Sequence, residues 1–246
     1  MGFHKDDCIL LPEYICDVIL HPINQLGLKY RYYSVDDSFS PRWDELEKLI
    51  NHKTKAIIMV HYFGQPQDIE KYKLFCNEHN LVLIEDNAHG HGGYYAKKLL
   101  GTYGDIGISS PRKVANLYSG GILYLNNNNN NNLKIESRLL PCPISIENHL
   151  KRILSNWSPS LKDYLKKKLS SRPHYEDPKA FRENEIVDYE IDKRSKNHIN
   201  KVDWDILRSR RQKQYYKWND FANKNNLVPA IDNLYPDANP WCFPAY

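Results

Sequence analysis

The sequence lacks the features that would place it outside the ordinary globular proteins. No apolar run in its 246 residues approaches the roughly 20 residues of a membrane-spanning helix. The first residues lack the apolar core of a signal peptide, and Asp6 stands where an N-myristoylation motif requires Ser or Thr. Hydrophobic residues make up 41% and charged residues 26%, so neither a disordered nor a fibrous chain is expected. These absences predict a folded cytoplasmic protein with no membrane partner.

Cysteine is scarce and is spaced for neither a disulfide framework nor a zinc site. The five cysteines are odd in number, lie far apart and include no Cys-x-x-Cys pair. A chain of this length buries enough surface to fold without cross-links or a structural metal. We therefore expect free thiols in a reducing compartment and no metal.

The net charge of +4 is small, but it is unevenly distributed along the chain. Residues 1–132 carry 13 Lys and Arg against 15 Asp and Glu, whereas residues 133–246 carry 21 against 15. A basic second half leaves nucleic acid or another anionic surface open as a partner. Because no known nucleic-acid motif accompanies the charge, we expect a solvated helical surface and no nucleic acid.

The first half alternates short apolar runs, rich in β-branched residues, with amphipathic stretches. Strands are predicted at residues 8–11, 29–35, 56–63, 81–85, 106–109 and 122–125. Residues 56–60 are apolar throughout, as in a strand that is covered on both faces. Helices are predicted at 13–26, where Pro22 would kink or end the helix, at 41–51, and after Asp68 as N-cap. The alternation predicts an α/β fold, with a mostly parallel sheet flanked by helices.

The second half is polar, basic and predominantly helical in pattern. Residues 126–132 are seven consecutive asparagines and predict a polar loop. Helices are predicted at 160–169 and at 202–223, and residues 172–196 are charged with little periodicity. The apolar face expected on the second helix comprises Trp204, Leu207, Tyr215, Trp218 and Phe221. The predicted domains are a large domain over residues 1–200 and the start of a small C-terminal domain over 201–246.

Polar residues directly follow the predicted strand at 81–85. In parallel sheets, functional groups collect on the loops after the carboxyl ends of the strands. Asp86 therefore either caps the following segment or faces a ligand. His89 and His91 come next, but two histidines are too few for a metal site, which needs three or four ligands. The glycines beside them favour a turn that approaches a ligand closely.

A lysine follows the next predicted strand and belongs to the same layer of loops. Lys113 is either a surface lysine or, in a partly desolvated pocket, a nucleophile that forms a Schiff base. A carboxylate after one strand, a lysine after the next and serines just before that lysine match the needs of pyridoxal phosphate. The carboxylate keeps the pyridine nitrogen protonated, the lysine binds the carbonyl carbon, and hydroxyl and N–H groups bind the phosphate.

Three segments resemble the DegT/StrS family of pyridoxal-phosphate-dependent sugar aminotransferases, which have fold type I. Residues 53–66 end like the family's V-H-x-x-G-x-P motif, and residues 84–92 resemble its I-E-D-x-A-[QH]-x-x-G motif. Residues 104–121 resemble the segment that carries the Schiff-base lysine and a closing Gly-Gly. Good similarity covers roughly residues 5–125, and weaker similarity returns at 208–218 and 240–244.

The resemblance implies an activity and a role for each matching residue. It implies transfer of an amino group from glutamate to a keto-sugar nucleotide, in surface-polysaccharide or related sugar biosynthesis, by a large domain that is incomplete here. Lys113 would be the Schiff-base lysine and proton carrier, and Asp86 would pair with the pyridine nitrogen. His89 would contact the ring near its phenolic oxygen. Ser110 would bind the phosphate, with Ser109 as the alternative. Because family members usually act as dimers, a homodimer is expected.

Departures from the family pattern leave a second interpretation open. Cys16, with Tyr14 nearby, stands where many members have an aromatic residue that stacks on the cofactor. The Ser-Gly-Thr type of phosphate-binding loop finds no counterpart before His4, and the small domain stops soon after it begins. The alternative is a catalytically impaired fragment or a non-catalytic relative. Some members have lost the lysine and act as dehydratases, and Lys113 argues against that version.

Overall fold

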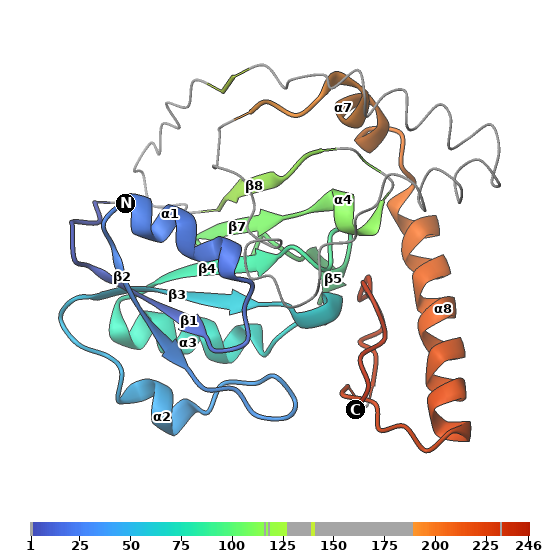
Figure 1. Ribbon diagram of the computed structural model, residues 1–246, viewed down its shortest axis with the longest axis horizontal. Coiled ribbons are helices and arrows are strands. Elements are labelled where there is room, and N and C mark those ends of the chain that lie inside the picture. Colours follow the sequence, from blue (N-terminus) through green and yellow to red (C-terminus); the bar gives the residue numbers. More distant parts are fainter. Residues whose placement is uncertain (1, 116, 118, 127–138, 141–188, 232) are drawn as a thin grey trace, which may run out of the picture. The chain divides into compact units, whose positions relative to one another are not determined.

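A six-stranded sheet forms the centre of the computed structural model, which describes residues 2–115, 117, 119–126, 139–140, 189–231 and 233–246 (Figure 1). The strand order is β2-β1-β3-β4-β7-β8. The strands are β1 (Cys8–Pro12), β2 (Lys29–Tyr33), β3 (Thr54–Val60), β4 (Val82–Asn87), β7 (Ile106–Ser109) and β8 (Ile122–Leu125). All neighbours are parallel except β7 and β8. The predicted α/β fold with a mostly parallel sheet is confirmed.

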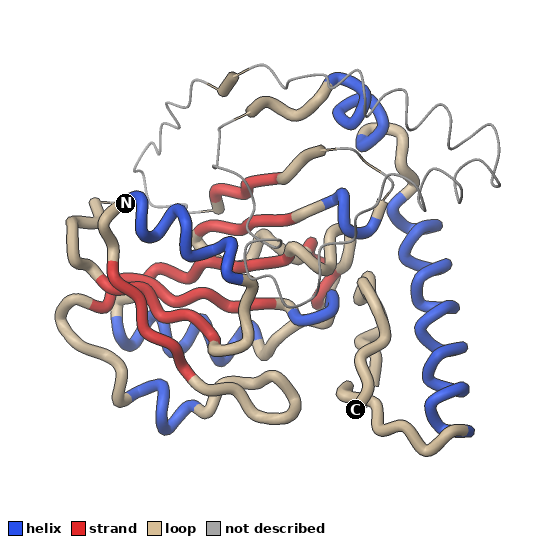
Figure 2. The backbone as a smooth tube through the Cα atoms, in the orientation of Figure 1, coloured by secondary structure: helices blue, strands red, loops and turns tan. Residues whose placement is uncertain are grey.

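Helices cover both faces of this sheet, as the apolar run of β3 predicts. Ile57 and Met59 pack on the face that holds α2 (Trp43–Glu47) and α3 (Ile69–His79). Ile58 on the same strand packs on the other face, which α1 (Leu20–Gln25) covers (Figures 1 and 2). Fully burying each such side chain stabilises the fold by about 1.5–3 kcal/mol. The predicted N-cap is confirmed, because the carboxylate of Asp68 accepts a hydrogen bond from the Lys71 N–H.

Helix α1 begins later in the chain than predicted. The prediction of a single helix over residues 13–26 is wrong. Cys16 is extended, a 3-10 helix spans Asp17–Ile19, and α1 spans Leu20–Gln25. Pro22 lies in the first turn of α1, where backbone N–H groups have no intrahelical acceptor. Its missing N–H therefore costs α1 no hydrogen bond, and the helix continues beyond it.

The long helix α8 (Trp204–Lys224) packs along a narrower stripe than predicted. Tyr215 and Ala222, two turns apart, are its buried residues. Trp218 and Phe221, predicted on the same face, are 56% and 49% exposed, so the prediction is wrong for these two side chains. The reason is that the C-terminal segment, residues 228–246, packs on Tyr215, through Leu234, Ala238 and Phe243, and leaves Trp218 and Phe221 largely exposed.

The remaining elements are short, and two compact units are present. A small hairpin is formed by β5 (Tyr94–Tyr95) and β6 (Lys98–Leu99), and α7 spans Lys193–Ile199. One unit comprises Met1–Ile135 and Lys193–Tyr246, and the other Glu136–Asp192. The domain boundary near residue 200 stays a prediction.

Some predicted segments lie outside the described residues. These are the asparagine run from 127 onward, the helix at 160–169 and residues 172–188. None of the described helices is long and apolar enough to cross a membrane.

Candidate active site

Two neighbouring strands bring the predicted site residues to one edge of the sheet. β4 and β7 pair in parallel with Asp86 opposite Ile108, so the turns that follow them meet at the carboxyl edge. His89 lies in the turn after β4, and Lys113 lies in the short helix α4 (Pro111–Val114) after β7. The charge of Lys113 acts on both Asp86 and His89. The fold therefore assembles residues that lie 27 positions apart in the sequence.

Asp86 is anchored through one carboxylate oxygen and offers the other. Its Oδ1 accepts a hydrogen bond of 2.8 Å from the Ala88 N–H. Its Oδ2 has no hydrogen-bond partner among the described residues. Burial raises the pKa of Asp86, although the Ala88 N–H and the positive charge of Lys113 act in the opposite direction. Both readings of Asp86 from the sequence are thus compatible, since one oxygen closes the turn while the other remains available to a ligand.

His89 is held as a neutral ring between two aromatic side chains. Its Nδ1 accepts a hydrogen bond of 3.3 Å from the Phe63 N–H, so its proton resides on Nε2. The imidazole stacks on the indole of Trp241, with ring centroids 4.5 Å apart, and on Phe63 at 6.1 Å. Burial, with the nearby charge of Lys113, lowers the pKa of His89 to about 4. The ring is therefore uncharged near pH 7 and can donate one hydrogen bond.

Lys113 is half-buried beneath the same indole. Its Nζ lies 5.2 Å from the centroid of the Trp241 ring, within the range of a cation–π interaction. It forms no ion pair with any carboxylate of the described residues. No role was predicted for Trp241, although it lies in the segment 240–244 where the weaker family similarity returns; the chain brings it to the site from the far end of the sequence.

The two serines before Lys113 are in different situations. Ser109 is buried, and its hydroxyl donates to the carbonyl of Asn87 while the Nδ1–H of His91 donates to it. Ser110 is the N-cap of α4, and its hydroxyl has no hydrogen-bond partner among the described residues. We therefore retain Ser110 as the predicted phosphate ligand, because the hydroxyl of Ser109 is already engaged.

Comparison with a protein-family model shows which known proteins the chain is related to. The model of the DegT/DnrJ/EryC1/StrS aminotransferase family matches residues 1–140, more than half of the sequence. The chain belongs to this family. The match includes all four predicted site residues, and the resemblance inferred from the motifs is confirmed.

Curated relatives of this DegT/StrS family member match it over its first half. A GDP-perosamine synthase of Vibrio cholerae is 30% identical over 130 residues, which cover 52% of this chain and 35% of that protein. A GDP-4-keto-6-deoxy-D-mannose 3-dehydratase of Yersinia pseudotuberculosis is 29% identical over 109 residues, 44% of this chain and 28% of that protein. The matched segment thus spans about a third of the curated relatives.

Two solved structures of the family share the fold of this chain. The Helicobacter pylori aminotransferase PseC, involved in pseudoaminic acid biosynthesis, superposes with a TM-score of 0.65 at 17% identity, covering 100% of this chain and 60% of that one. A DegT/DnrJ/EryC1/StrS aminotransferase of Brucella abortus gives a TM-score of 0.63 at 18% identity, covering 98% and 58%. At these identities the comparison establishes the fold alone.

The residues present fit the family's cofactor, pyridoxal phosphate. Asp86 has a free carboxylate oxygen, Ser110 has a free hydroxyl, and Lys113 is without a carboxylate partner among the described residues. A metal ion has no comparable site, because the described residues contain no group of three or more His, Cys, Asp or Glu side chains that could hold one. His91 instead has a structural role, donating to Ser109 and packing against Trp204.

Glu85, next to Asp86, is a buried carboxylate whose contacts were not predicted from the sequence. Its carboxylate is fully buried and accepts hydrogen bonds from the backbone N–H groups of Gly101, Tyr103 and Gly104, at 2.6, 2.6 and 2.9 Å. A fourth comes from the Nε2–H of His61, at 2.9 Å. One signal in the sequence could have indicated this: Glu85 is two residues beyond Leu83 and so points to the same buried face of the strand.

The contact between Glu85 and His61 is a hydrogen bond from a neutral ring and not a full ion pair. His61 Nδ1 accepts a hydrogen bond of 3.1 Å from the Gln67 N–H, so the only ring proton lies on Nε2 and points to Glu85. Burial acts to raise the pKa of Glu85, but the bonds from His61, Gly101 and Gly104 outweigh it and lower the pKa. Glu85 is therefore an ionised carboxylate that ties β4 to the turn at 101–104.

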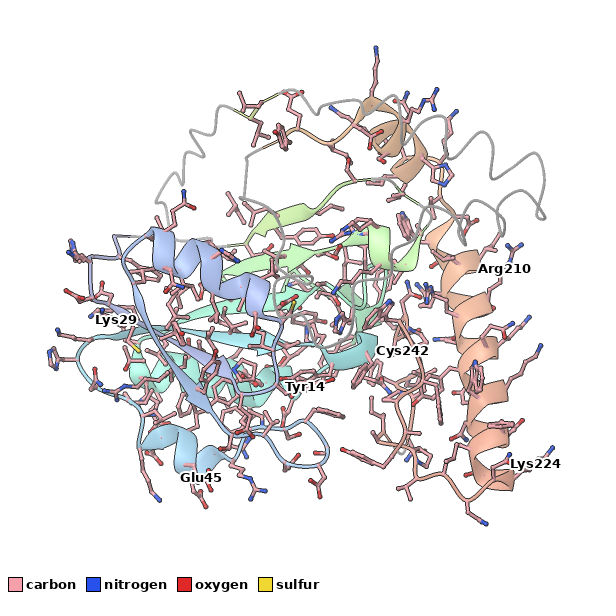
Figure 3. The ribbon with its side chains drawn as sticks, in the orientation of Figure 1. Tyr14, Lys29, Glu45, Arg210, Lys224 and Cys242 are labelled. Atoms are coloured by element: carbon pink, nitrogen blue, oxygen red, sulfur yellow. The ribbon has the colours of Figure 1, made fainter. Side chains whose placement is uncertain are left out.

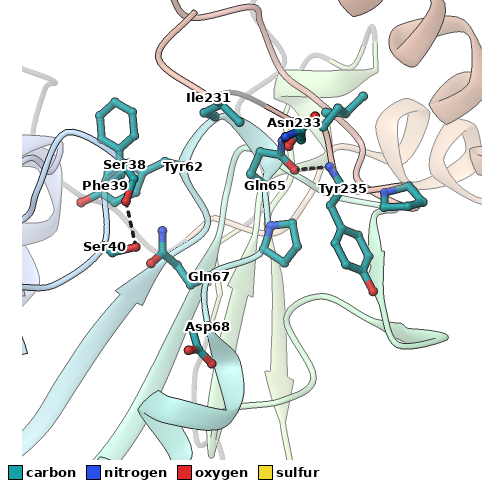
Figure 4. A pocket seen from close by; sticks show the side chains of 13 residues that line it. Ser38, Phe39, Ser40, Tyr62, Gln65, Gln67, Asp68, Ile231, Asn233 and Tyr235 are labelled. Carbon is teal, nitrogen blue, oxygen red and sulfur yellow. Dashed lines mark hydrogen bonds between the residues drawn. The ribbon is translucent and has the colours of Figure 1, made fainter.

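A separate cavity of about 360 Å³ lies beside the turn that follows β3 (Figure 4). Its lining includes Phe39, Tyr62 and Gln67, with residues 231 and 233–236 of the C-terminal segment closing one side. Gln65 joins these parts, accepting from the Tyr235 N–H and donating to the Asn233 carbonyl. None of the four predicted site residues lines this cavity, so it is distinct from the Asp86–Lys113 site.

Acidification is expected to destabilise the protein because His89 and His91 resist protonation in the folded state. Burial lowers the pKa of each to about 4, whereas an unfolded histidine titrates near a pH of about 6.5. Because both folded-state pKa values are depressed, their contribution is complete above that pH and is lost as the pH falls towards 4. At about 1.4 kcal/mol per pKa unit, the loss is at most about 3 kcal/mol for each.

Urea unfolding at several pH values between 7 and 4 measures this loss. His91→Gln removes one titrating group and should reduce the slope of unfolding free energy against pH, whereas the lowered pKa of Glu85 contributes to the slope equally in both proteins. Asp86, with its raised pKa, acts in the opposite direction, so slopes are compared and not single values. Equal slopes for the wild type and His91→Gln would contradict the prediction.

Proposed function

We propose that this chain binds pyridoxal phosphate and transfers an amino group from glutamate to a keto-sugar nucleotide. One observation carries the proposal: a free carboxylate oxygen on Asp86 and an amine on Lys113 lie on adjacent turns at the carboxyl edge of the sheet. The names of the relatives support the substrate class, since they include a GDP-perosamine synthase and an aminotransferase of pseudoaminic acid biosynthesis. The proposed setting is surface-polysaccharide or related sugar biosynthesis in the cytoplasm.

Each residue has a role that follows from its surroundings. When bound, the cofactor supplies a ring that withdraws electrons from the substrate carbon. Asp86 would hold a proton at the ring nitrogen, and a cation there would favour the ionised carboxylate that burial alone disfavours. His89 would donate its Nε2–H to the ring oxygen while remaining uncharged. Ser110 would bind the phosphate, and Lys113 would hold the cofactor covalently and move the substrate proton.

A homodimer is part of the proposal, and it is inferred from the family resemblance. Among the predicted residues, only Ser110 offers a side chain to the phosphate. A second subunit would be expected to supply further phosphate and sugar contacts, because a phosphate group accepts several hydrogen bonds at once.

One observation favours the alternative, a catalytically impaired or non-catalytic relative. The indole of Trp241 stacks on the imidazole of His89 and lies over Lys113, so part of the surface that a cofactor ring would use is covered. Trp241 is 40% exposed and lies on a segment outside the sheet. The two interpretations differ in whether Lys113 reacts with the cofactor while Trp241 covers it, which chemical trapping of the lysine can measure.

Incubation with pyridoxal phosphate followed by borohydride is expected to leave a reduced adduct on Lys113, located by peptide mapping. Lys113→Ala should lose this adduct and the visible absorbance of the bound cofactor. The matched control is Lys53→Ala, which removes an exposed lysine before the amino end of β3, at the opposite end of the parallel strands from Lys113, and should keep both. Identical spectra for the wild type and Lys113→Ala would overturn the catalytic proposal in favour of the alternative.

A further inference from the structure

Arg211, on α8, joins the turn that carries Lys113 to the segment that carries Trp241. Its guanidinium donates to the carbonyl of Val114 from Nε at 3.3 Å and from Nη2 at 3.1 Å, and to the carbonyl of Lys113 at 3.4 Å. Its Nη1 donates to the carbonyls of Pro240 and Trp241 at 3.0 and 3.1 Å. One side chain thus binds four carbonyl oxygens from two separate segments.

The chemistry of these contacts suits arginine and no other side chain. The carbonyls of Lys113 and Val114 end the short helix α4, where backbone acceptors lack intrahelical donors and the helix dipole favours a cation. Arg211 forms no ion pair with a carboxylate of the described residues. Burial lowers its pKa from the usual range, yet a guanidinium stays charged. The planar fork reaches both segments at once, which the single ammonium group of lysine cannot do.

The second segment is held from the other side as well. The Trp241 N–H donates to the carbonyl of Phe63 at 2.8 Å, and the indole stacks on His89. The C-terminal segment runs between α8 and the carboxyl edge of the sheet, where Figure 3 labels the neighbouring Cys242. The position of the Trp241 ring over the Lys113 amine therefore depends on Arg211 through the backbone on both sides.

We propose that Arg211 is the positioning residue of this site: by binding both backbone segments, it fixes the Lys113 amine and the Trp241 indole relative to each other. The proposal rests on the proposed function, in which Lys113 is the reactive amine. In this proposal Arg211 contacts none of the reacting atoms. Its effect is to keep the lysine turn from moving away from Asp86 and His89 when the amine reacts.

Amide hydrogen exchange tests the positioning without any cofactor. Arg211→Gln should speed exchange roughly tenfold or more in both segments, at the Lys113 and Ala115 amides of the α4 turn and at the Trp241 amide. Gln212→Leu is the matched control, because Gln212 lies on the same helix and, among the described residues, binds the carbonyls of Pro236 and Ala238 and none of the α4 turn. It should leave the α4 turn unchanged. Exchange in β3 checks that both variants are folded.

Adduct formation with pyridoxal phosphate supplies the second readout. At saturating cofactor, Arg211→Gln should form the borohydride-trapped adduct roughly tenfold more slowly than the wild type, and Arg211→Lys should fall between them. Equal rates, unchanged exchange in the α4 turn, or an equal effect of Gln212→Leu there would overturn the proposal. If the wild type forms no adduct, the proposed function fails, and the exchange data alone decide whether Arg211 holds the two segments.

Discussion

Replacing Glu85 with alanine is expected to destabilise the protein by at least about 3 kcal/mol, because each buried donor left without its acceptor costs about 1–3 kcal/mol. The carboxylate is fully buried and accepts four hydrogen bonds, three of them from the backbone at Gly101, Tyr103 and Gly104. Its loss would leave these N–H groups and the Nε2–H of His61 buried without acceptors. Since small domains are stable by only about 5–15 kcal/mol, much of the folded population would be lost.

Urea unfolding at pH 7 measures this effect. Glu85→Gln keeps one acceptor oxygen and should cost less than Glu85→Ala. The control is Glu70→Ala on α3, where the carboxylate is 61% exposed in its pair with Lys73 and should contribute at most about 1 kcal/mol. A loss of similar size at Glu85 and Glu70 would show that the buried carboxylate is not the anchor of this turn.

Gly107→Ala is expected to prevent stable folding, with a loss of more than about 4 kcal/mol. Gly107 lies on β7 directly opposite Glu85 on β4. A Cβ atom there would lie 1.7 Å from the carbonyl oxygen of Gly101, which is backbone and cannot rotate away. Gly101 is itself constrained, with a φ of 97° and its N–H bonded to Glu85, so the turn cannot retreat without breaking the bonds to the carboxylate.

Gly121→Ala is the matched control for this substitution. Gly121 precedes β8, the next strand of the sheet, and a Cβ there would meet only the carbonyl oxygen of Ser109, at 3.7 Å. That is ordinary van der Waals contact, so the change should stay within about 1 kcal/mol. Circular dichroism and thermal unfolding of both variants provide the comparison. A folded Gly107→Ala protein with a normal thermal transition would contradict the packing described here.

Glu85, Gly101 and Gly107 together explain how the candidate site is held in place. The turn at 101–104 lies across β4 and β7, the two strands whose carboxyl ends lead to Asp86 and to the helix of Lys113. The buried carboxylate binds this turn, and the absent side chain at Gly107 makes room for it. The stability of the fold and the geometry of the site therefore depend on the same few residues.

The sequence was most informative where a residue's environment follows from its immediate neighbours. The apolar run of β3 predicted a strand covered on both faces, and Asp68 predicted a helix start. The motifs around Asp86 and Lys113 predicted two turns at one edge of the sheet, and the pairing of β4 with β7 places them there. Local pattern was less reliable in helices, because the exposure of Trp218 and Phe221 depends on what packs against α8.

The α/β fold, the family and the candidate residues could be predicted from the sequence, because strand periodicity and short motifs are local properties of the chain. These residues are Lys113, Asp86, His89 and Ser110. Their contact partners follow from the folded chain and could not be predicted in this way. Trp241 and Arg211 reach the site from more than 90 residues beyond Lys113, and no local pattern encodes a contact at that separation. The same holds for Glu85, because the turn at 101–104 that binds its carboxylate lies 16 or more residues further along the chain.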